Sequence, residues 1–441
     1  MQKRMLFFII SFVIFSFAAA ENYEEVRCYQ VGPGSVYTNY LERSKPWDIH
    51  VVSIDLTNPR IRLESVKAGD RKLGREVTSS MSRRSDREAH RIVSAVNGDF
   101  YNTTNGVPIN NQVVNGEFVH AYTYHRSAFT YARNRKAAIV IPIFSGELVA
   151  KVDSSGDAVR HPLSTVNRDR YADYLVIYNR FMGASTGTNE WGTECLARPL
   201  SGWVVNDTVY AVIEARESGT GDMTIPGDKF VISGHGTAQT FLNEHCGVGD
   251  TVKIVQRLEG SPPGLTQLVG GGPRLLENGT EIIAAAAADE GVGTSFCTAR
   301  HPRTAVGFNA DSTVAYFVVV DGRQEHSAGM SLYELADFMK YIGASHATNL
   351  DGGGSSTMTV RSEVRNVPSD GWERIVANAM MCVSTAPDGD LSLIQIERDS
   401  IAVYETMLSN FRFPAGTRTT TPGDSLGVGP GHQLQRGPRR V

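Results

Sequence analysis

The fold is decided by the segment Val314–Asp321, whose sequence is VAYFVVVD. A run that is apolar at every position is typical of a strand covered on both faces, whereas a half-exposed strand alternates apolar and polar residues. The apolar run ends at the turn Asp321-Gly322-Arg323. We therefore predict a central, doubly covered strand with Asp321 at its end.

A helix is predicted directly after this strand. Ser331-Leu332-Tyr333-Glu334 has the spacing of a capping box, in which the serine and glutamate side chains satisfy the first free amides of a helix. Apolar residues then recur on one face up to Met339, and Gly343 supplies a stop. Strand, helix and the loop that follows them form one predicted unit.

That loop, Asn349–Met358, has the sequence NLDGGGSSTM and is the predicted centre of the chemistry. Glycine lacks a Cβ, so three in a row allow backbone amides to approach a ligand. Asp351 supplies the charge, and the neighbouring amide and hydroxyls suit a polar, oxygen-rich substrate. The alternative is a glycine-rich turn in which Asp351 bonds its own backbone. Each glycine beyond the one a turn needs costs roughly 0.5–1 kcal/mol of chain entropy, which favours the functional interpretation.

The remaining chain is predicted to be rich in strands. Residues 47–56 and 60–66 form a strand pair, residues 78–91 a helix, and residues 91–96 a strand that ends at Asn97-Gly98-Asp99. This last stretch is either an ordinary turn or a second wall of the site. A second glycine-rich loop spans Gly270–Arg274. The fold class is α+β, with a large mixed β-sheet core, few flanking helices and the site where Asp321 and Asp351 emerge from strand ends.

Composition and the N-terminus indicate the compartment. The 441-residue chain has a formal net charge of -4 and a pI of about 6.3, so neither nucleic acid nor an anionic membrane is an expected partner. Lys3 and Arg4 precede the apolar run Met5–Phe17 and three alanines, which is typical of a signal peptide cleaved after Ala20. We expect a secreted or periplasmic protein without stable membrane insertion, and one or two disulfides among its five cysteines. The oligomeric state is unknown at this stage.

These patterns divide the chain into five parts. They are a signal peptide (1–20), an N-terminal β-rich segment packed on the catalytic domain (21–90), the catalytic domain (91–385), a fragment of a small β module (386–412) and a disordered tail (413–441).

The motifs, in this order, resemble those of the phosphodiester glycosidase family over residues 91–383. The resemblance is carried by Asn97-Gly98, the Gly-Gly-Gly-Pro loop at 270–273, Arg303–Gly307, Asp321-Gly322-Arg323, the Ser331–Met339 helix and Asn349–Ser356. It implies an enzyme that cleaves a sugar from a phosphodiester at the anomeric carbon and releases a phosphomonoester. N-acetylglucosamine is the candidate sugar.

The resemblance also implies roles for individual residues. Asp351 and Asp321 are the predicted catalytic residues: Asp351 acts as base or nucleophile at the anomeric carbon, and Asp321 fixes hydroxyls or tunes Asp351. Arg303 and the loop amides hold phosphate, unless Arg303 forms a structural ion pair. Asp99 stands where many members have glycine, which separates it from the family pattern. The predicted substrate- and phosphate-binding residues are Arg303, Asn97, Gly98, Asp99, Thr304, Asn349, Gly352, Gly353, Gly354, Ser355, Ser356 and Arg274.

One carboxylate is enough for this chemistry, because a phosphate monoester with a second pKa of roughly 6 leaves without being protonated, whereas a sugar alkoxide needs a general acid. Two other functions stay open: hydrolysis of ordinary glycosidic bonds in surface polysaccharide, and non-catalytic carbohydrate binding in the cell envelope. No cofactor and no metal is predicted, because no His, Cys or carboxylate spacing recurs. Calcium held by Asp321, Asp351 and carbonyls is left open.

Overall fold

The computed structural model describes residues 23–122, 124–152, 158–387, 395–396 and 411–412. The predicted signal peptide and disordered tail lie outside the described residues. So does most of the predicted β-module fragment, of which the two-stranded sheet of β27 (Gln395–Ile396) and β28 (Phe411–Arg412) is described. Within the described part of the chain, no helix is long and apolar enough to cross a bilayer.

The predicted central strand is β22 (Val314–Val320), in an eight-stranded antiparallel sheet. Phe317 and Val319 pack into one buried cluster, and Val318 and Val320 pack into another on the opposite face. The prediction of a doubly covered strand is therefore confirmed. In spatial order the sheet contains β1 (Glu24–Gly32), β2 (Ser35–Glu42), β3 (Trp47–Asp55), β22, β21 (Arg303–Phe308), β23 (His346–Asn349), β19 (Arg274–Glu277) and β20 (Thr280–Glu281).

Helices cover one face of this sheet. The helix α5 (Leu332–Tyr341) begins at Ser331, whose hydroxyl accepts from the amide of Glu334 at 3.2 Å while the glutamate carboxylate accepts from the amide of Ser331 at 2.9 Å. The predicted capping box is thus present. Phe338 joins Val318 in the cluster beneath the helix. The same cluster receives side chains of α3 (Ile283–Asp289) and α4 (Thr294–Thr298).

Two five-stranded antiparallel sheets lie against the other face. Val96 and Met380 of one, and Phe129 of the other, pack with Phe317 of β22 in a shared cluster. The first sheet contains β25 (Glu363–Val364), β24 (Met358–Val360), β5 (Arg91–Asn97), β26 (Asn378–Ser384) and β4 (Ile61–Lys67), with α1 (Thr78–Ser85) beside β5. The second contains β7 (Glu117–His120), β6 (Gln112–Val114), β18 (Leu265–Gly270), β8 (Ala128–Ala132) and β9 (Ala137–Val140).

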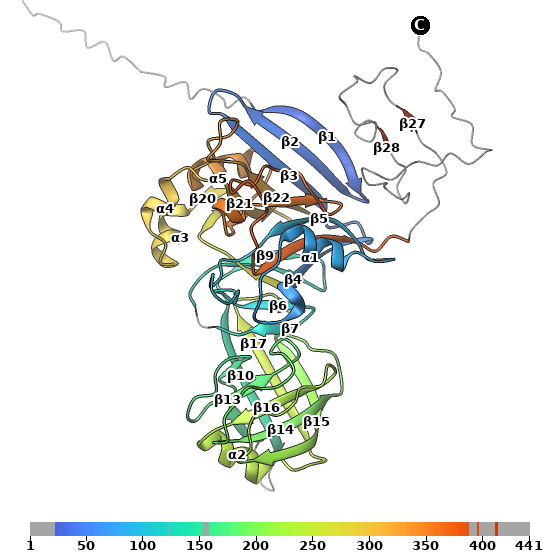
Figure 1. Ribbon diagram of the computed structural model, residues 1–441, viewed down its shortest axis with the longest axis vertical. Helices are drawn as coiled ribbons and strands as arrows, with labels where there is room; N and C mark the ends of the chain where they lie inside the picture. The colour runs from blue at the N-terminus through green and yellow to red at the C-terminus, as the bar shows by residue number, and fades with distance from the viewer. Residues whose placement is uncertain (1–22, 123, 153–157, 388–394, 397–410, 413–441) are drawn as a thin grey trace, which may run out of the picture.

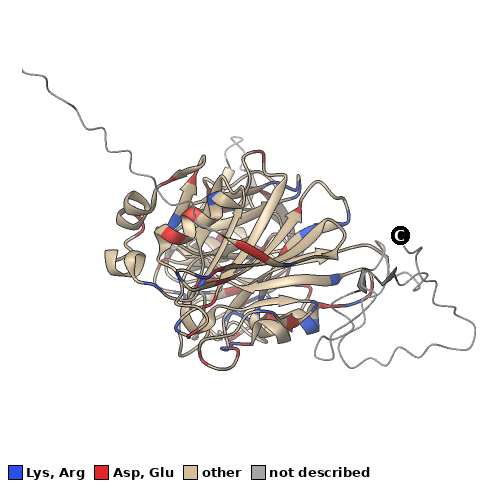
Figure 2. Cartoon of the chain, turned by 90° about the horizontal axis from the view of Figure 1, so that it is seen from above, with Lys and Arg blue, Asp and Glu red and all other residues tan. Residues whose placement is uncertain are grey.

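The described residues of 143–259 form a further lobe, at the bottom of Figure 1, whose buried cluster is continuous with side chains of the second five-stranded sheet such as Phe118 and Leu268. Its eight strands are β11 (Ala158–Pro162), β10 (Ile143–Val152), β17 (Thr251–Glu259), β15 (Asp207–Ser218), β14 (Thr193–Pro199), β16 (Phe230–Gly234), β13 (Leu175–Tyr178) and β12 (Thr165–Val166), joined by α2 (Thr237–His245). The pair β12 and β13 is parallel and the other pairs are antiparallel. The α+β class with few flanking helices is confirmed, and basic and acidic residues are interspersed over its sheets and loops (Figure 2).

The N-terminal strands are continuous with later parts of the chain. β3 pairs with β22, and β4 pairs with β26, so residues before the predicted boundary at 90 lie in the same sheets as residues of the predicted catalytic domain. The division at residue 90 stays a prediction. The expected disulfides are not formed: all five cysteines are free, and four of them are buried.

Candidate active site

The two predicted walls of the site meet. Asp351 directly follows β23, and its amide donates to the carbonyl oxygen of Gly98 at 2.9 Å. The side-chain amide of Asn97 donates to the carbonyl oxygen of Asp351 at 2.6 Å. The end of β5 therefore holds the start of the glycine-rich loop, as the functional interpretation of Asn97-Gly98-Asp99 requires.

The side chain of Asn97 stabilises the contact between β5 and the glycine-rich loop. It is fully buried, and its side-chain oxygen accepts from the hydroxyl of Thr304 at 2.8 Å and from the amide of Thr357 at 3.0 Å. All of these partners are protein groups. Asn97 and Thr304, both predicted to contact substrate, thus position the backbone around Asp351.

Asp99 is a fully buried carboxyl group within electrostatic reach of Asp351. Its two oxygens accept from the backbone amide of Asn110 at 2.8 Å and from the side-chain amide of Asn110 at 2.7 Å. Burial, with a smaller contribution from the charge of Asp351, raises the pKa of Asp99 to about 7 against the effect of these bonds. Asp99 therefore keeps its proton below about pH 7.

Asp351 is more accessible than Asp99, since it is only half-buried. Burial nevertheless raises the pKa of Asp351 to about 6, while the nearby charge of Arg374 opposes the rise. The Ser355 hydroxyl also favours the charged form as an electrostatic neighbour, although its geometry gives no well-formed hydrogen bond. Asp351 is thus the partner that ionises first and faces solvent.

Buried polar atoms without partners gather around this pair. Among the described residues, no hydrogen bond is made by the side-chain oxygens of Asn349, Ser355, Ser356, Thr357 and Asn110. Native proteins leave few buried polar groups unsatisfied, so each one calls for an explanation. These five oxygens, on the Asp351 loop and beside Asp99, are able to form hydrogen bonds with the hydroxyl groups of a ligand.

The glycine-rich loop forms the 3₁₀ turn η2 (Gly353–Ser355), with Gly353 at a φ of 63°. The amides of Gly353, Ser355 and Ser356 donate to the carbonyls of Pro302, Gly352 and Gly353. These three amides are therefore occupied and do not cradle an anion in this conformation. The absent side chains serve close packing instead: a Cβ on Gly353 would lie 3.2 Å from the guanidinium of Arg323, and one on Gly354 would meet that of Arg374.

The two arginines predicted to hold phosphate are engaged with protein groups. Arg303 is buried, with Nε donating to the carbonyl of Met330 at 2.9 Å and Nη2 donating to two further carbonyls. Arg274 pairs with Glu290 at 3.1 Å and with Asp289 at 2.8 Å. Neither predicted ion pair of Arg303 with an aspartate is formed. The geometry favours structural roles for Arg303 and Arg274.

Three other arginines surround the carboxyl pair, and the sequence analysis did not assign them to the site. Arg323 lies beside Gly353, Arg374 lies beside Gly354, and Arg126 is close enough to Asp99 to lower its pKa. Nε of Arg126 is buried without a partner among the described residues. The sequence contained one signal for Arg323, its place directly after Asp321-Gly322 in one of the motifs that carry the family resemblance. In the structure Arg323 has a φ of 60°, which is strained for a residue other than glycine.

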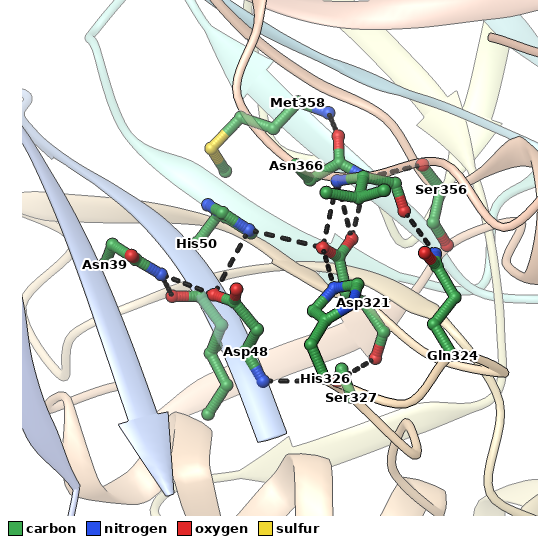
Figure 3. A network of polar contacts seen from close by, with 12 residues as sticks. Asn39, Asp48, His50, Asp321, Gln324, His326, Ser327, Ser356, Met358 and Asn366 are labelled. Atoms are coloured by element: carbon green, nitrogen blue, oxygen red, sulfur yellow. Dashed lines mark hydrogen bonds and ion pairs between the residues drawn. The ribbon is translucent and has the colours of Figure 1, made fainter. Parts of the chain in front are cut away.

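Asp321 belongs to a separate network, shown in Figure 3. It is 1% exposed, and its oxygens accept from the side-chain amide of Asn366 at 3.0 Å, the amide of Val367 at 2.9 Å and Nε2 of His326 at 3.2 Å. Burial alone would raise the pKa of Asp321, but His50 and these donors hold it below its ordinary value. Asp321 forms no hydrogen bond with Asp351, so its predicted tuning role is at most indirect.

A small aromatic cavity of about 110 Å³, open to solvent, is lined by Tyr122, Arg168, Tyr171 and Tyr174 among others. The ring of Tyr122 stacks on that of Tyr124 at 5.2 Å. The guanidinium of Arg126 lies 6.0 Å from the Tyr124 ring and so connects the cavity with the surroundings of Asp99.

A scan against protein families matches residues 202–383 to the family described as phosphodiester glycosidase. The matched segment contains Asp321 and Asp351 but neither Asp99 nor Asp48. Among characterised proteins, the chain is similar to N-acetylglucosamine-1-phosphodiester alpha-N-acetylglucosaminidase of Mus musculus, with 33% identity over 111 residues. That match covers 24% of this chain and 21% of the mouse enzyme, so the chain matches about a fifth of its length.

Two solved structures share the fold. A hypothetical protein from Synechocystis has a TM-score of 0.60 at 20% identity, covering 83% of this chain and 64% of that one. A putative exported protein from Burkholderia pseudomallei has a TM-score of 0.55 at 25% identity, covering 76% of this chain and 74% of that one. The arrangement of sheets described above thus occurs in both of these proteins.

Proposed function

Because residues 202–383 belong to the phosphodiester glycosidase family, we propose that this protein is a hydrolase that removes a sugar from a sugar-1-phosphodiester at the anomeric carbon. The observation that carries the proposal is the pair of buried carboxyl groups, Asp99 and Asp351, with pKa values raised to about 7 and about 6 beside unpaired hydroxyls. Perturbed pairs of this kind are typical of sites that move protons.

Asp351 acts on the anomeric carbon. At neutral pH it is largely ionised, and it is the more accessible of the two. As a base it takes a proton from water while the water oxygen bonds to the anomeric carbon; as a nucleophile it first forms a glycosyl ester that water then hydrolyses. In both routes the bond from the anomeric carbon to oxygen breaks, and its electron pair leaves with the phosphomonoester.

Asp99 is the proton-holding partner. Burial holds the proton on Asp99 below about pH 7, and the charge on Asp351 adds a smaller effect in the same direction. Because Asp99 is neutral when it holds its proton, Asp351 can be ionised without a second negative charge close to it. The two pKa values belong to the pair as a whole.

Phosphate binding is assigned to Arg323, which is exposed, and to Arg374, which is partly exposed and would exchange its ion pair with Asp370 for the phosphate. Arg323 and Arg374 both flank the glycine-rich loop, and the missing side chains of Gly353 and Gly354 let their guanidinium groups approach. A planar guanidinium suits bidentate contact with a phosphodiester. The aromatic cavity near Tyr122 offers stacking faces for the group beyond the phosphate.

The sugar and compartment follow from the relatives. N-acetylglucosamine is proposed because the mouse relative is named for it. Secretion or periplasmic location is proposed because the first twenty residues have the pattern of a signal peptide and a protein of the same fold is a putative exported protein.

One observation favours a second candidate, hydrolysis of ordinary glycosidic bonds. Such a reaction needs a general acid, and Asp99 carries a proton at neutral pH. The dependence of kcat/KM on pH separates the two. A phosphodiester substrate needs only ionised Asp351, so activity rises through about pH 6 and then stays level. A glycoside that needs the Asp99 proton loses activity again above about pH 7.

The direct test is product analysis by mass spectrometry in oxygen-18 water. Substrates are UDP-N-acetylglucosamine and a simple alkyl N-acetylglucosamine-1-phosphodiester, with Asp351→Asn and the exposed control Asp337→Asn alongside. Label in the sugar, lost only in Asp351→Asn, is the expected result. Label in the phosphate would mean cleavage of the P–O bond, and binding without product in both substrates would favour a carbohydrate-binding protein.

A further inference from the structure

Four side chains far apart in the sequence converge behind the candidate active site. Asp48 and His50 lie on β3, and Asp321 and His326 lie in the segment after β22 (Figure 3). One ligand atom from each of Asp48, Asp321 and His326 lies within 4.8 Å of the others. This cluster is distinct from the Asp99–Asp351 pair.

His50 gives an independent sign that the cluster holds a ligand. Its side chain is 5% exposed, and Nε2 makes no hydrogen bond among the described residues. That nitrogen nevertheless points at the carboxylates, 3.4 Å from Oδ1 of Asp48 and 3.6 Å from Oδ2 of Asp321. This buried imidazole nitrogen lies at ion-pair distance from both carboxylates but makes no well-formed hydrogen bond to either, which leaves room for an ion between the three groups.

The spacing of these atoms suits a tetrahedral metal ion. Zinc binds histidine nitrogen and carboxylate oxygen at about 2.0–2.2 Å, so the edge of the ligand tetrahedron is about 3.3–3.6 Å. The two distances from His50 lie at such edges, and Nε2 of His326 lies 3.2 Å from Oδ2 of Asp321. The ligand atoms of Asp48, Asp321 and His326 lie up to 4.8 Å apart, so binding draws these side chains together, and His326, which is 39% exposed, gives an ion access from solvent.

Neighbouring polar groups already orient the proposed ligands. Nδ1 of His50 lies 2.8 Å from the hydroxyl of Tyr37, and Oδ1 of Asp48, the oxygen that faces His50, also accepts from the side-chain amide of Asn39 at 2.6 Å. The other oxygen of Asp321 accepts from the side-chain amide of Asn366. Hydrogen bonds of this kind orient metal ligands, and an imidazole that donates from Nδ1 presents the Nε2 lone pair to an ion.

We propose that Asp48, His50, Asp321 and His326 bind a divalent transition-metal ion of the zinc type. Two imidazoles and two carboxylates favour zinc over calcium or magnesium, which prefer all-oxygen sites. The ion joins β3 to the segment after β22. Asn366 extends the connection, because its side-chain amide also donates to the carbonyl of Ser356, next to the Asp351 loop. The ion has a structural role that steadies the active-site loop.

The test measures metal binding by the full mature chain without an affinity tag. Protein treated with EDTA is titrated with Co²⁺, followed by the visible absorption of a tetrahedral site, and with Zn²⁺, followed by bound metal after gel filtration. The variants are His326→Ala and Asp48→Asn. The control is His125→Ala, because His125 forms an exposed ion pair with Asp289 and no third ligand.

We expect one ion per wild-type chain, a raised melting temperature with Zn²⁺, and retention of both in His125→Ala. His326→Ala and Asp48→Asn should lose stoichiometric binding and the melting shift while retaining the circular dichroism spectrum of the wild type. Absence of stoichiometric Co²⁺ and Zn²⁺ binding by the wild type would overturn the proposal. Unchanged binding in both variants would overturn it equally.

Discussion

Two pairs of aspartates are brought together from distant strands, and their surroundings give them opposite properties. Asp99 is buried and Asp351 is half-buried, and both have few donors, so burial raises their pKa values to about 7 and about 6. Asp321, beside Asp48, is equally enclosed but receives His50, Asn366 and Val367, which hold its pKa below the ordinary value. Burial alone thus does not decide the protonation state of a carboxyl group. The hydrogen-bond donors around the group determine whether its pKa is raised, so that it keeps a proton, or lowered, so that it is ionised.

The largest expected effect concerns the ionised member of the first pair. Asp351→Asn removes the base or nucleophile, and kcat/KM should fall by about 10³-fold or more, which corresponds to roughly 4 kcal/mol of transition-state stabilisation. Steady-state kinetics with the phosphodiester substrate checks this. Activity within a few-fold of the wild type, in a folded variant, would remove Asp351 from the mechanism.

For the second pair, Asp48 and Asp321, substitution should change the stability of the fold. Asp321→Asn leaves buried donors and His50 without their acceptor and should lower the free energy of unfolding by roughly 2–4 kcal/mol. Urea unfolding at pH 7.5 measures the change. Equal stability of this variant and the wild type would mean that the network around Asp321 is not structural.

Substitution in the first pair, Asp99 and Asp351, should raise the free energy of unfolding, whereas substitution of Asp321 lowers it. Because its folded pKa values are raised, the native state binds more protons than the unfolded state between about pH 4 and 7, and stability falls as pH rises through that range. Asp351→Asn removes part of this cost and should raise the free energy of unfolding above pH 7 by on the order of 1–3 kcal/mol. Urea unfolding at a series of pH values tests it, and a pH-independent difference from the wild type would contradict the account.

The arginines should show the smallest effects. Arg323→Lys keeps the charge but loses the planar fork, so KM for a phosphodiester should rise about tenfold with little change in melting temperature. Arg303→Lys should instead lower the melting temperature, since Arg303 donates to three backbone carbonyls. The reverse pattern would restore the original assignment of phosphate binding to Arg303.

Local patterns predicted much of this structure. The apolar run at 314–320, the capping box at Ser331 and the strand before Asn97 all carry their information within a few residues, and the structure has β22, α5 and β5 there. Asn97-Gly98-Asp99 was left open between an ordinary turn and a second wall of the site, and the structure places its backbone in contact with Asp351.

The role of Arg303 and the cluster around His50 were not predicted, because both depend on contacts between segments that are distant in the sequence. The partners of Arg303 are carbonyls, which every residue has, so no side-chain pattern distinguishes its structural role from phosphate binding. His50 and Asp321 meet only because β3 pairs with β22, and this register is not encoded by any local spacing. The proposed metal ligands therefore showed no motif.

The central claim, a coupled pair of buried carboxyl groups at the active site, is tested most directly by carboxyl-carbon NMR titration of the protein labelled at aspartate, with Asp99→Asn and Asp351→Asn used for assignment. The account predicts two carboxyl groups that titrate near pH 6 and pH 7, and a lower pKa for Asp99 once the charge of Asp351 is removed. Ordinary values near 4 for both groups, unaffected by either substitution, would contradict it.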